Sequence, residues 1–75
     1  MKLRYSLLIR WSDEDNTYPV SLPELYGEGR YATHGKTYEE ALKNGLEVME
    51  LLTETLTEEG HALPEPSKVR HAAAI

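Results

Sequence analysis

Residues 37–60 read TYEEALKNGLEVMELLTETLTEEG, the longest periodic stretch in the chain. Thr37 stands before the run and Glu40 follows three residues later, which is the capping-box pattern of a helix N-terminus. Apolar residues then recur at three- and four-residue steps with glutamates on the opposite side, and Gly60 supplies a C-terminal stop. The spacing predicts one amphipathic helix over residues 38–59.

Two positions in this predicted helix depart from a simple amphipathic pattern. Gly45 lies within the apolar stripe, where it costs about 1 kcal/mol relative to Ala. Close approach of the helix to the sheet, or to a second copy of the chain, would compensate. Leu51 projects from the charged side, about 140° from the stripe centre, and is either an ordinary exposed leucine or an oligomer or partner contact. The residues of the stripe are Tyr38, Ala41, Leu42, Gly45, Leu46, Val48, Met49, Leu52 and Leu56.

The first part of the chain alternates with the period of two that is typical of half-buried strands. Alternation covers residues 2–11 and 17–22, and the polar residues 12–16 between them predict a turn, so the two runs form a β-hairpin. Residues 30–34 form a third short strand. Because Pro19 has no backbone N–H, we expect the second strand at an edge of the sheet, or Pro19 at a non-bonding position.

The order of these elements predicts a two-layer α+β domain over residues 1–75, with one long amphipathic helix packed on one face of the sheet. Residues 23–29 end the second strand and form a flexible connection. Residues 62–66 are extended because of their prolines. The end of the chain alternates as a strand over residues 68–73 would, but residues 72–74 are all Ala and favour a helix, so strand, helix and disordered tail stay open.

Composition and charge limit the function. The chain has 75 residues, 13 acids against 8 Lys and Arg, a net charge of −5 and no Cys. Disulfides and Cys-based zinc sites are therefore excluded. The acidic balance disfavours nonspecific binding to nucleic acid or membrane and leaves either a simply soluble surface or a basic protein partner. A core this small favours self-association. We find no signal peptide or membrane span in the sequence and expect a cytoplasmic protein.

The residues do not predict catalysis. In the acidic turn that begins at Asp13, Tyr18 stands where a calcium-binding loop needs Gly. The histidines lack the spacing of a helical zinc site, and the serines lack a nucleophile motif. We therefore expect no enzyme, no metal site and no cofactor. The six Tyr and Trp residues leave an RNA-stacking sheet as a further alternative, which the negative charge disfavours.

Four stretches of the chain form one combined pattern: residues 5–15 (YSLLIRWSDED), 18–25 (YPVSLPEL), 32–41 (ATHGKTYEEA) and 63–66 (LPEP). Taken together, over roughly residues 3–66, they resemble the HicB-like antitoxin family. The resemblance implies a β-β-β-α-β domain, likened to a partial ribonuclease H fold, that self-associates as dimers, tetramers or larger assemblies. On this analogy the end of the chain supplies the fourth strand.

The resemblance also implies a partner. Domains of this family bind and neutralise a small, basic HicA-type toxin, a ribonuclease that cleaves mRNA. Their usual C-terminal DNA-binding domain does not fit the fifteen residues after Gly60, and the connection over residues 26–31 is longer than usual. We expect a non-enzymatic antitoxin-like protein; the alternative is a stand-alone oligomer of the same fold with no toxin partner. A basic partner would be steered to the acidic helix face, so the expected contacts are Glu40, Glu47, Leu51 and Glu54.

Overall fold

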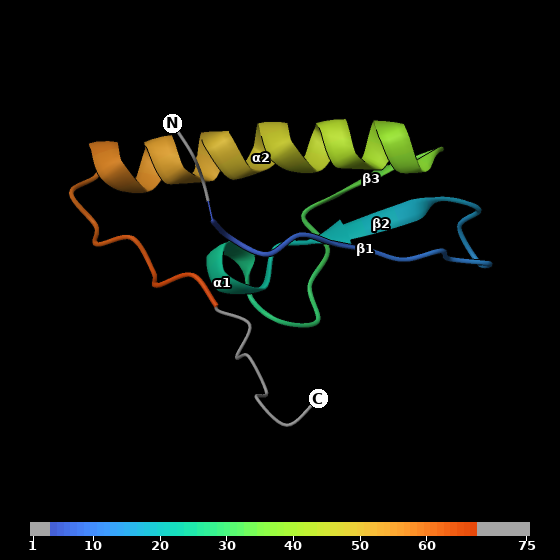
Figure 1. Ribbon diagram of the computed structural model, residues 1–75, viewed down its shortest axis with the longest axis horizontal. Helices are drawn as coiled ribbons and strands as arrows, with labels where there is room; N and C mark the ends of the chain where they lie inside the picture. The colour runs from blue at the N-terminus through green and yellow to red at the C-terminus, as the bar shows by residue number, and fades with distance from the viewer. Residues whose placement is uncertain (1–3, 68–75) are drawn as a thin grey trace, which may run out of the picture.

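The computed structural model describes residues 4–67. It confirms the α+β class, with a three-stranded antiparallel sheet in the order β1-β2-β3 and one long helix, α2, along one face of the sheet. Figure 1 shows α2 running above β1 and β2, and the short helix α1 below it. The expected strand over residues 68–73 lies outside the described residues. The elements are β1 (Leu8–Ile9), β2 (Tyr18–Ser21), α1 (Pro23–Tyr26), β3 (Thr33–Gly35) and α2 (Tyr38–Glu58).

The N-terminus of α2 is fixed by the predicted capping box. Thr37 Oγ1 accepts a hydrogen bond from the N–H of Glu40 at 3.0 Å. The Glu40 carboxylate reaches back and accepts from the N–H of Lys36 at 2.9 Å. Because both bonds satisfy backbone donors that have no partner within the first helical turn, they hold the start of α2 at Tyr38.

The C-terminus of α2 is fixed by Gly60, as predicted. Gly60 has a φ of +76°, in the left-handed region that glycine adopts at little cost. This conformation lets the N–H of Gly60 donate to the Thr57 carbonyl at 3.1 Å and the N–H of His61 donate to the Leu56 carbonyl at 2.9 Å. These two bonds satisfy the last helical carbonyls. The prediction of a helix over residues 38–59 is therefore confirmed to within one residue.

The core lies where α2 crosses β2 at very short range. A Cβ added to Gly45 would lie 2.7 Å from Leu7 Cδ1 and 3.0 Å from Val20 Cγ1, so the glycine allows the helix backbone to approach the sheet. Of the two compensations expected for Gly45, the structure shows the approach to the sheet. The helix residues buried on this side of α2 recur at four-residue steps: Ala41, Gly45, Met49 and Thr53.

Part of the predicted apolar stripe does not enter the core. Tyr38, Leu42 and Leu46 all remain exposed, whereas the sequence pattern placed them with the buried residues. The reason is the position of the helix, which is tied to β3 by a 2.8 Å hydrogen bond from Asn44 Nδ2 to the His34 carbonyl. The flank of α2 that carries the two leucines therefore overhangs β1 at the edge of the sheet.

The hairpin between β1 and β2 is confirmed. The N–H of Ser12 donates to the Thr17 carbonyl at 2.9 Å and closes the turn. Asn16 has a φ of +53°, which asparagine tolerates better than most residues. At the end of the first strand segment, the Trp11 ring lies edge-on to the Tyr18 ring, with 5.0 Å between centroids.

The expectation for Pro19 is wrong, because β2 is the central strand of the three. The Pro19 carbonyl accepts from the N–H of Arg10 at 3.2 Å, and the N–H and C=O of one residue point to the same neighbour in an antiparallel ladder. The missing N–H therefore faces β1, at a bonding position. The ladder loses a hydrogen bond there, and β1 spans only Leu8–Ile9 where a strand over residues 2–11 was predicted.

The connection between β2 and β3 also differs from the prediction. Residues 23–29 contain the short helix α1, with Pro23 at its start, where the fixed φ of proline suits a helix. The Arg30 guanidinium lies 4.5 Å from the centre of the Tyr26 ring. This contact holds Arg30 against α1, so the third strand covers Thr33–Gly35 instead of residues 30–34.

Candidate partner-binding surface

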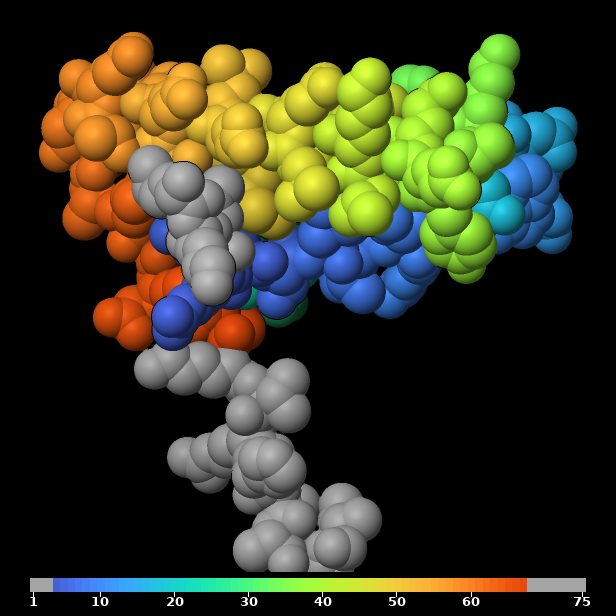
Figure 2. Space-filling model, turned by 45° about the horizontal axis from the view of Figure 1, so that its top comes forward, coloured from blue at the N-terminus to red at the C-terminus, as the bar shows by residue number. Residues whose placement is uncertain are grey.

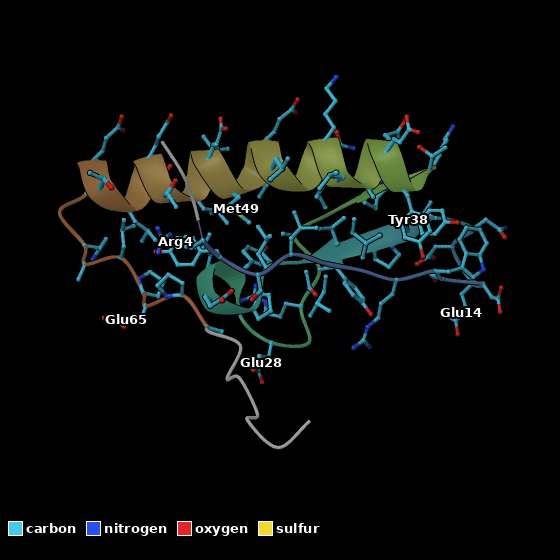
Figure 3. All side chains as sticks on the ribbon, viewed as in Figure 1. Arg4, Glu14, Glu28, Tyr38, Met49 and Glu65 are labelled. Atoms are coloured by element: carbon cyan, nitrogen blue, oxygen red, sulfur yellow. The ribbon has the colours of Figure 1, made fainter. Side chains whose placement is uncertain are left out.

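Helix α2 carries the entire net charge of the chain. It contains six glutamates and one lysine, Lys43, which gives a charge of −5. The other seven acids of the chain are balanced by seven Lys and Arg residues. All seven charged side chains of α2 are exposed, and Figure 3 shows oxygen-tipped side chains along the side of α2 that faces away from the sheet. The acidic character predicted for the molecule is therefore concentrated on one helix face.

Three of the four predicted contact residues lie together on this face. Glu47, Leu51 and Glu54 are separated by four and three residues, so they fall on one side of the helix over about 10 Å of its axis. The same geometry adds Glu50 and Glu58, which the sequence analysis did not select. The signals that identify them are the steps of three residues from Glu47 to Glu50 and four from Glu50 to Glu54, and the seven-residue step from Leu51 to Glu58. We call these five residues, Glu47, Glu50, Leu51, Glu54 and Glu58, the Leu51 surface.

Leu51 is the apolar member of the Leu51 surface. Its side chain is 61% exposed, while Met49 and Thr53, two residues away on either side, are buried against the sheet. A leucine at this position contributes nothing to the core of the single chain. An exposed apolar side chain bordered on one side by carboxylates has the arrangement of an interface anchor beside a polar rim.

Glu40 is separate from the other predicted contact residues. It lies about 21 Å along the helix axis from Glu54 at 1.5 Å per residue, and its carboxylate caps the helix by accepting from the N–H of Lys36. We therefore assign Glu40 to the stability of α2 and exclude it from the Leu51 surface.

Glu24 is the carboxylate with the most developed set of hydrogen bonds, and sequence reasoning missed it. It accepts from the N–H and the hydroxyl of Ser6 and from the N–H of Ser67, each at 2.9 Å. Partial burial raises the pKa of Glu24, but the hydrogen bonds from Ser67 and Ser6 and from its own N–H outweigh burial and lower the pKa to about 2. Glu24 thus ties both ends of the described chain to α1, a structural role.

The sheet face opposite α2 holds a shallow depression. Val20 faces α2, so its neighbour Pro19 and the Pro19 partner His34 point to the other face. The depression there has a volume of about 370 Å³. Within residues 4–67, no three His, Cys, Asp or Glu side chains gather as a metal site. The residues that line the depression are Asp15, Thr17, Pro19, Tyr31, Ala32, Thr33 and His34.

No protein-family model, curated protein or solved structure matches this chain. The helices within the described part of the chain are also too short or too polar to cross a membrane. The function is therefore inferred from the chain's own residues, with the Leu51 surface as the candidate site.

Proposed function

We propose that this chain is a non-enzymatic interaction protein that binds a small basic protein through the Leu51 surface, as a HicB-like antitoxin binds a HicA-type toxin. The observation that carries the proposal is the charge of −5 on α2 around an exposed leucine. The cytoplasm as its compartment and a ribonuclease H-like strand arrangement belong to the same proposal.

The Leu51 surface has the two properties that such binding requires. The glutamates on one helix face attract a basic partner over several ångströms and raise the association rate. Leu51 then enters an apolar pocket of the partner and buries apolar area in the complex, which slows dissociation. A ribonuclease whose RNA-binding surface is basic would meet carboxylates in place of phosphates, and its substrate would be excluded.

Coexpression with the small basic protein encoded by the adjacent reading frame tests this function. The wild-type chain is expected to restore growth and to copurify with the basic protein at low salt. The variant Leu51→Glu is expected to lose both effects. The control Leu8→Glu changes a leucine of β1 that is 43% exposed, against 61% for Leu51, and is expected to keep them. No complex at low salt and no rescue by the wild-type chain would refute the proposal.

The second candidate function is a stand-alone oligomer of this fold with no toxin partner. The observation that favours it is the set of exposed apolar side chains on the flank of α2, which includes Leu42 and Leu46. The absence of a basic reading frame beside the gene would support this alternative.

A further inference from the structure

A shallow groove lies at the C-terminal end of α2, directly beside the Leu51 surface. Its volume is about 230 Å³, and its lining is mostly apolar. Pockets that hold small molecules usually have about 300–1,000 Å³, so this groove suits a single side chain of a partner. We call it the Leu63 groove. Its lining consists of Thr53, Glu54, Thr57 and Glu58 from α2 and Leu63 from the segment that follows the helix.

The chain reversal after α2 builds the second wall of the Leu63 groove. Gly60, with its φ of +76°, turns the chain back. Figure 2 shows the segment after α2, in darker orange, folded below the orange end of the helix. The Tyr5 hydroxyl donates to the Pro64 carbonyl at 2.7 Å and holds this segment in place. Leu63, the neighbour of Pro64, is therefore 43% exposed and lines the groove instead of the core.

The two threonines give the groove an apolar floor. The Thr53 hydroxyl donates to the Met49 and Glu50 carbonyls at 3.1 and 2.9 Å. The Thr57 hydroxyl donates to the Thr53 carbonyl at 2.8 Å. Because the helix backbone occupies both hydroxyls, the threonine methyl groups are the parts left for contact with a ligand. Together with Leu63 they form a surface that favours an aliphatic chain.

Two carboxylates form the outer rim of the groove. Glu54 and Glu58 are exposed and follow one another by about one helical turn, with about 5–6 Å between their Cβ atoms. Each lies about 100° around the helix from the threonine that precedes it, so the carboxylates stand on the solvent side of the apolar floor. The groove is therefore complementary to a side chain with an aliphatic stem and a cationic head.

Arginine fits this combination better than lysine. Its planar guanidinium carries five N–H donors and can bond two carboxylates at once, whereas the lysine ammonium is a compact, strongly hydrated point charge. The weaker hydration of the guanidinium also lowers the free energy needed to remove it from water. Protein interfaces are accordingly enriched in arginine and depleted of lysine.

We propose that the Leu63 groove holds an arginine side chain of the basic protein partner. The arginine stem packs on Leu63 and the threonine methyl groups, and the guanidinium donates to Glu54 and Glu58. For the existence of the partner, this inference rests on the proposed function. It adds a contact in the reverse direction to that of Leu51, since the chain inserts a leucine into the partner and receives an arginine from it.

Methyl NMR of the full chain with N-acetylarginine amide tests the groove without a protein partner. The methyl signals of Leu63 and Thr57 are expected to shift with a millimolar dissociation constant, while those of Leu8, exposed on β1, stay in place. N-acetylcitrulline amide is the matched control, since it has the same shape without the charge, and is expected to cause no shift. Equal shifts with both compounds, or no shift at Leu63 with either, would overturn the proposal.

Two variants test the parts of the groove in the same titration. Glu54→Gln together with Glu58→Gln is expected to weaken binding of the arginine derivative about fivefold. Thr57→Val keeps two methyl groups and removes only the hydroxyl, so it is expected to bind as the wild-type chain does. Binding lost in Thr57→Val and kept in the glutamine variant would contradict the assigned roles of floor and rim.

The basic protein that tests the proposed function separates the two claims. Leu63→Ala is expected to weaken its binding at least about tenfold, and Thr57→Val is expected to leave it unchanged. Binding that is lost in Leu51→Glu and intact in Leu63→Ala would overturn the groove and keep the proposed function. Binding of the arginine derivative by a chain that binds no basic protein would refute the proposed function and support the groove as an arginine site.

Discussion

The substitution Gly35→Ala tests how tightly β3 holds the start of α2. A Cβ at Gly35 would meet backbone atoms of the first turn of α2 and would contact the N atom of Ala41. It would lie 2.7 Å from Ala41 Cα and 2.8 Å from the carbonyl carbon of Glu40. Ordinary contacts of a Cβ are 3.4 Å or longer, so the helix must move by well over half an ångström.

The cost of this movement is high because no flexible side chain absorbs it. Overpacking a well-packed site costs roughly 1–3 kcal/mol and occasionally more. Here the atoms that must move belong to the capped first turn of α2, so we place Gly35→Ala at about 3 kcal/mol. For a domain of this size that lowers the melting temperature by roughly 12–24 °C.

Gly45→Ala is the matched control on the same helix. Its added Cβ meets the end of the Leu7 side chain at 2.7 Å and Val20 Cγ1 at 3.0 Å. The Leu7 side chain can turn away, and alanine gains about 1 kcal/mol in helix propensity, so the net change should stay within about 1 kcal/mol. Urea denaturation followed by circular dichroism measures both. A Gly35→Ala variant as stable as Gly45→Ala would refute the close contact between β3 and α2.

Two further predictions concern side chains that accept backbone hydrogen bonds. Because the pKa of Glu24 falls from 4.5 to about 2 on folding, its stabilisation is full above pH 4.5 and is lost as the pH falls toward 2. Because Glu24 is partly exposed, solvent screening reduces this stabilisation to about 1–2 kcal/mol. Denaturation at several pH values should show that acid destabilises Glu24→Gln less than it destabilises the wild-type chain. Equal acid sensitivity of the two proteins would contradict the prediction. Thr37→Ala should lower the free energy of unfolding by about 1 kcal/mol, as measured by denaturation. An unchanged free energy of unfolding would exclude the cap.

The sequence predicts α2 well because the signals that start and stop a helix are local. Thr37 and Glu40 act within one turn, and the left-handed φ of Gly60 acts on the two residues beside it. The spacing of Glu47, Leu51 and Glu54 also follows from helix geometry alone. The shared face of the candidate site could therefore be predicted before any tertiary contact was known.

The sheet is harder to predict because strand order and length depend on contacts distant in sequence. Alternation places Tyr18 and Val20 on one side of a strand, but it does not reveal that Pro19 lies in the centre of the sheet. The hydrogen bond from the Ser67 N–H to the Glu24 carboxylate joins positions 43 residues apart. For the same reason the sequence pattern assigns Leu46 to the core, whereas the attachment of α2 to β3 through Asn44 leaves that side chain 46% exposed.

The affinity of the chain for a small basic HicA-type protein tests the central claim most directly. Calorimetric titration should show binding that weakens as salt increases. A variant carrying Glu47→Lys, Leu51→Ala and Glu54→Lys should lose at least about 100-fold in affinity. The control with Glu14→Lys and Glu28→Lys makes the same change in net charge at exposed positions away from α2 and should stay within about threefold of wild type. Equal losses in the two variants would show that net charge, and not the Leu51 surface, determines binding.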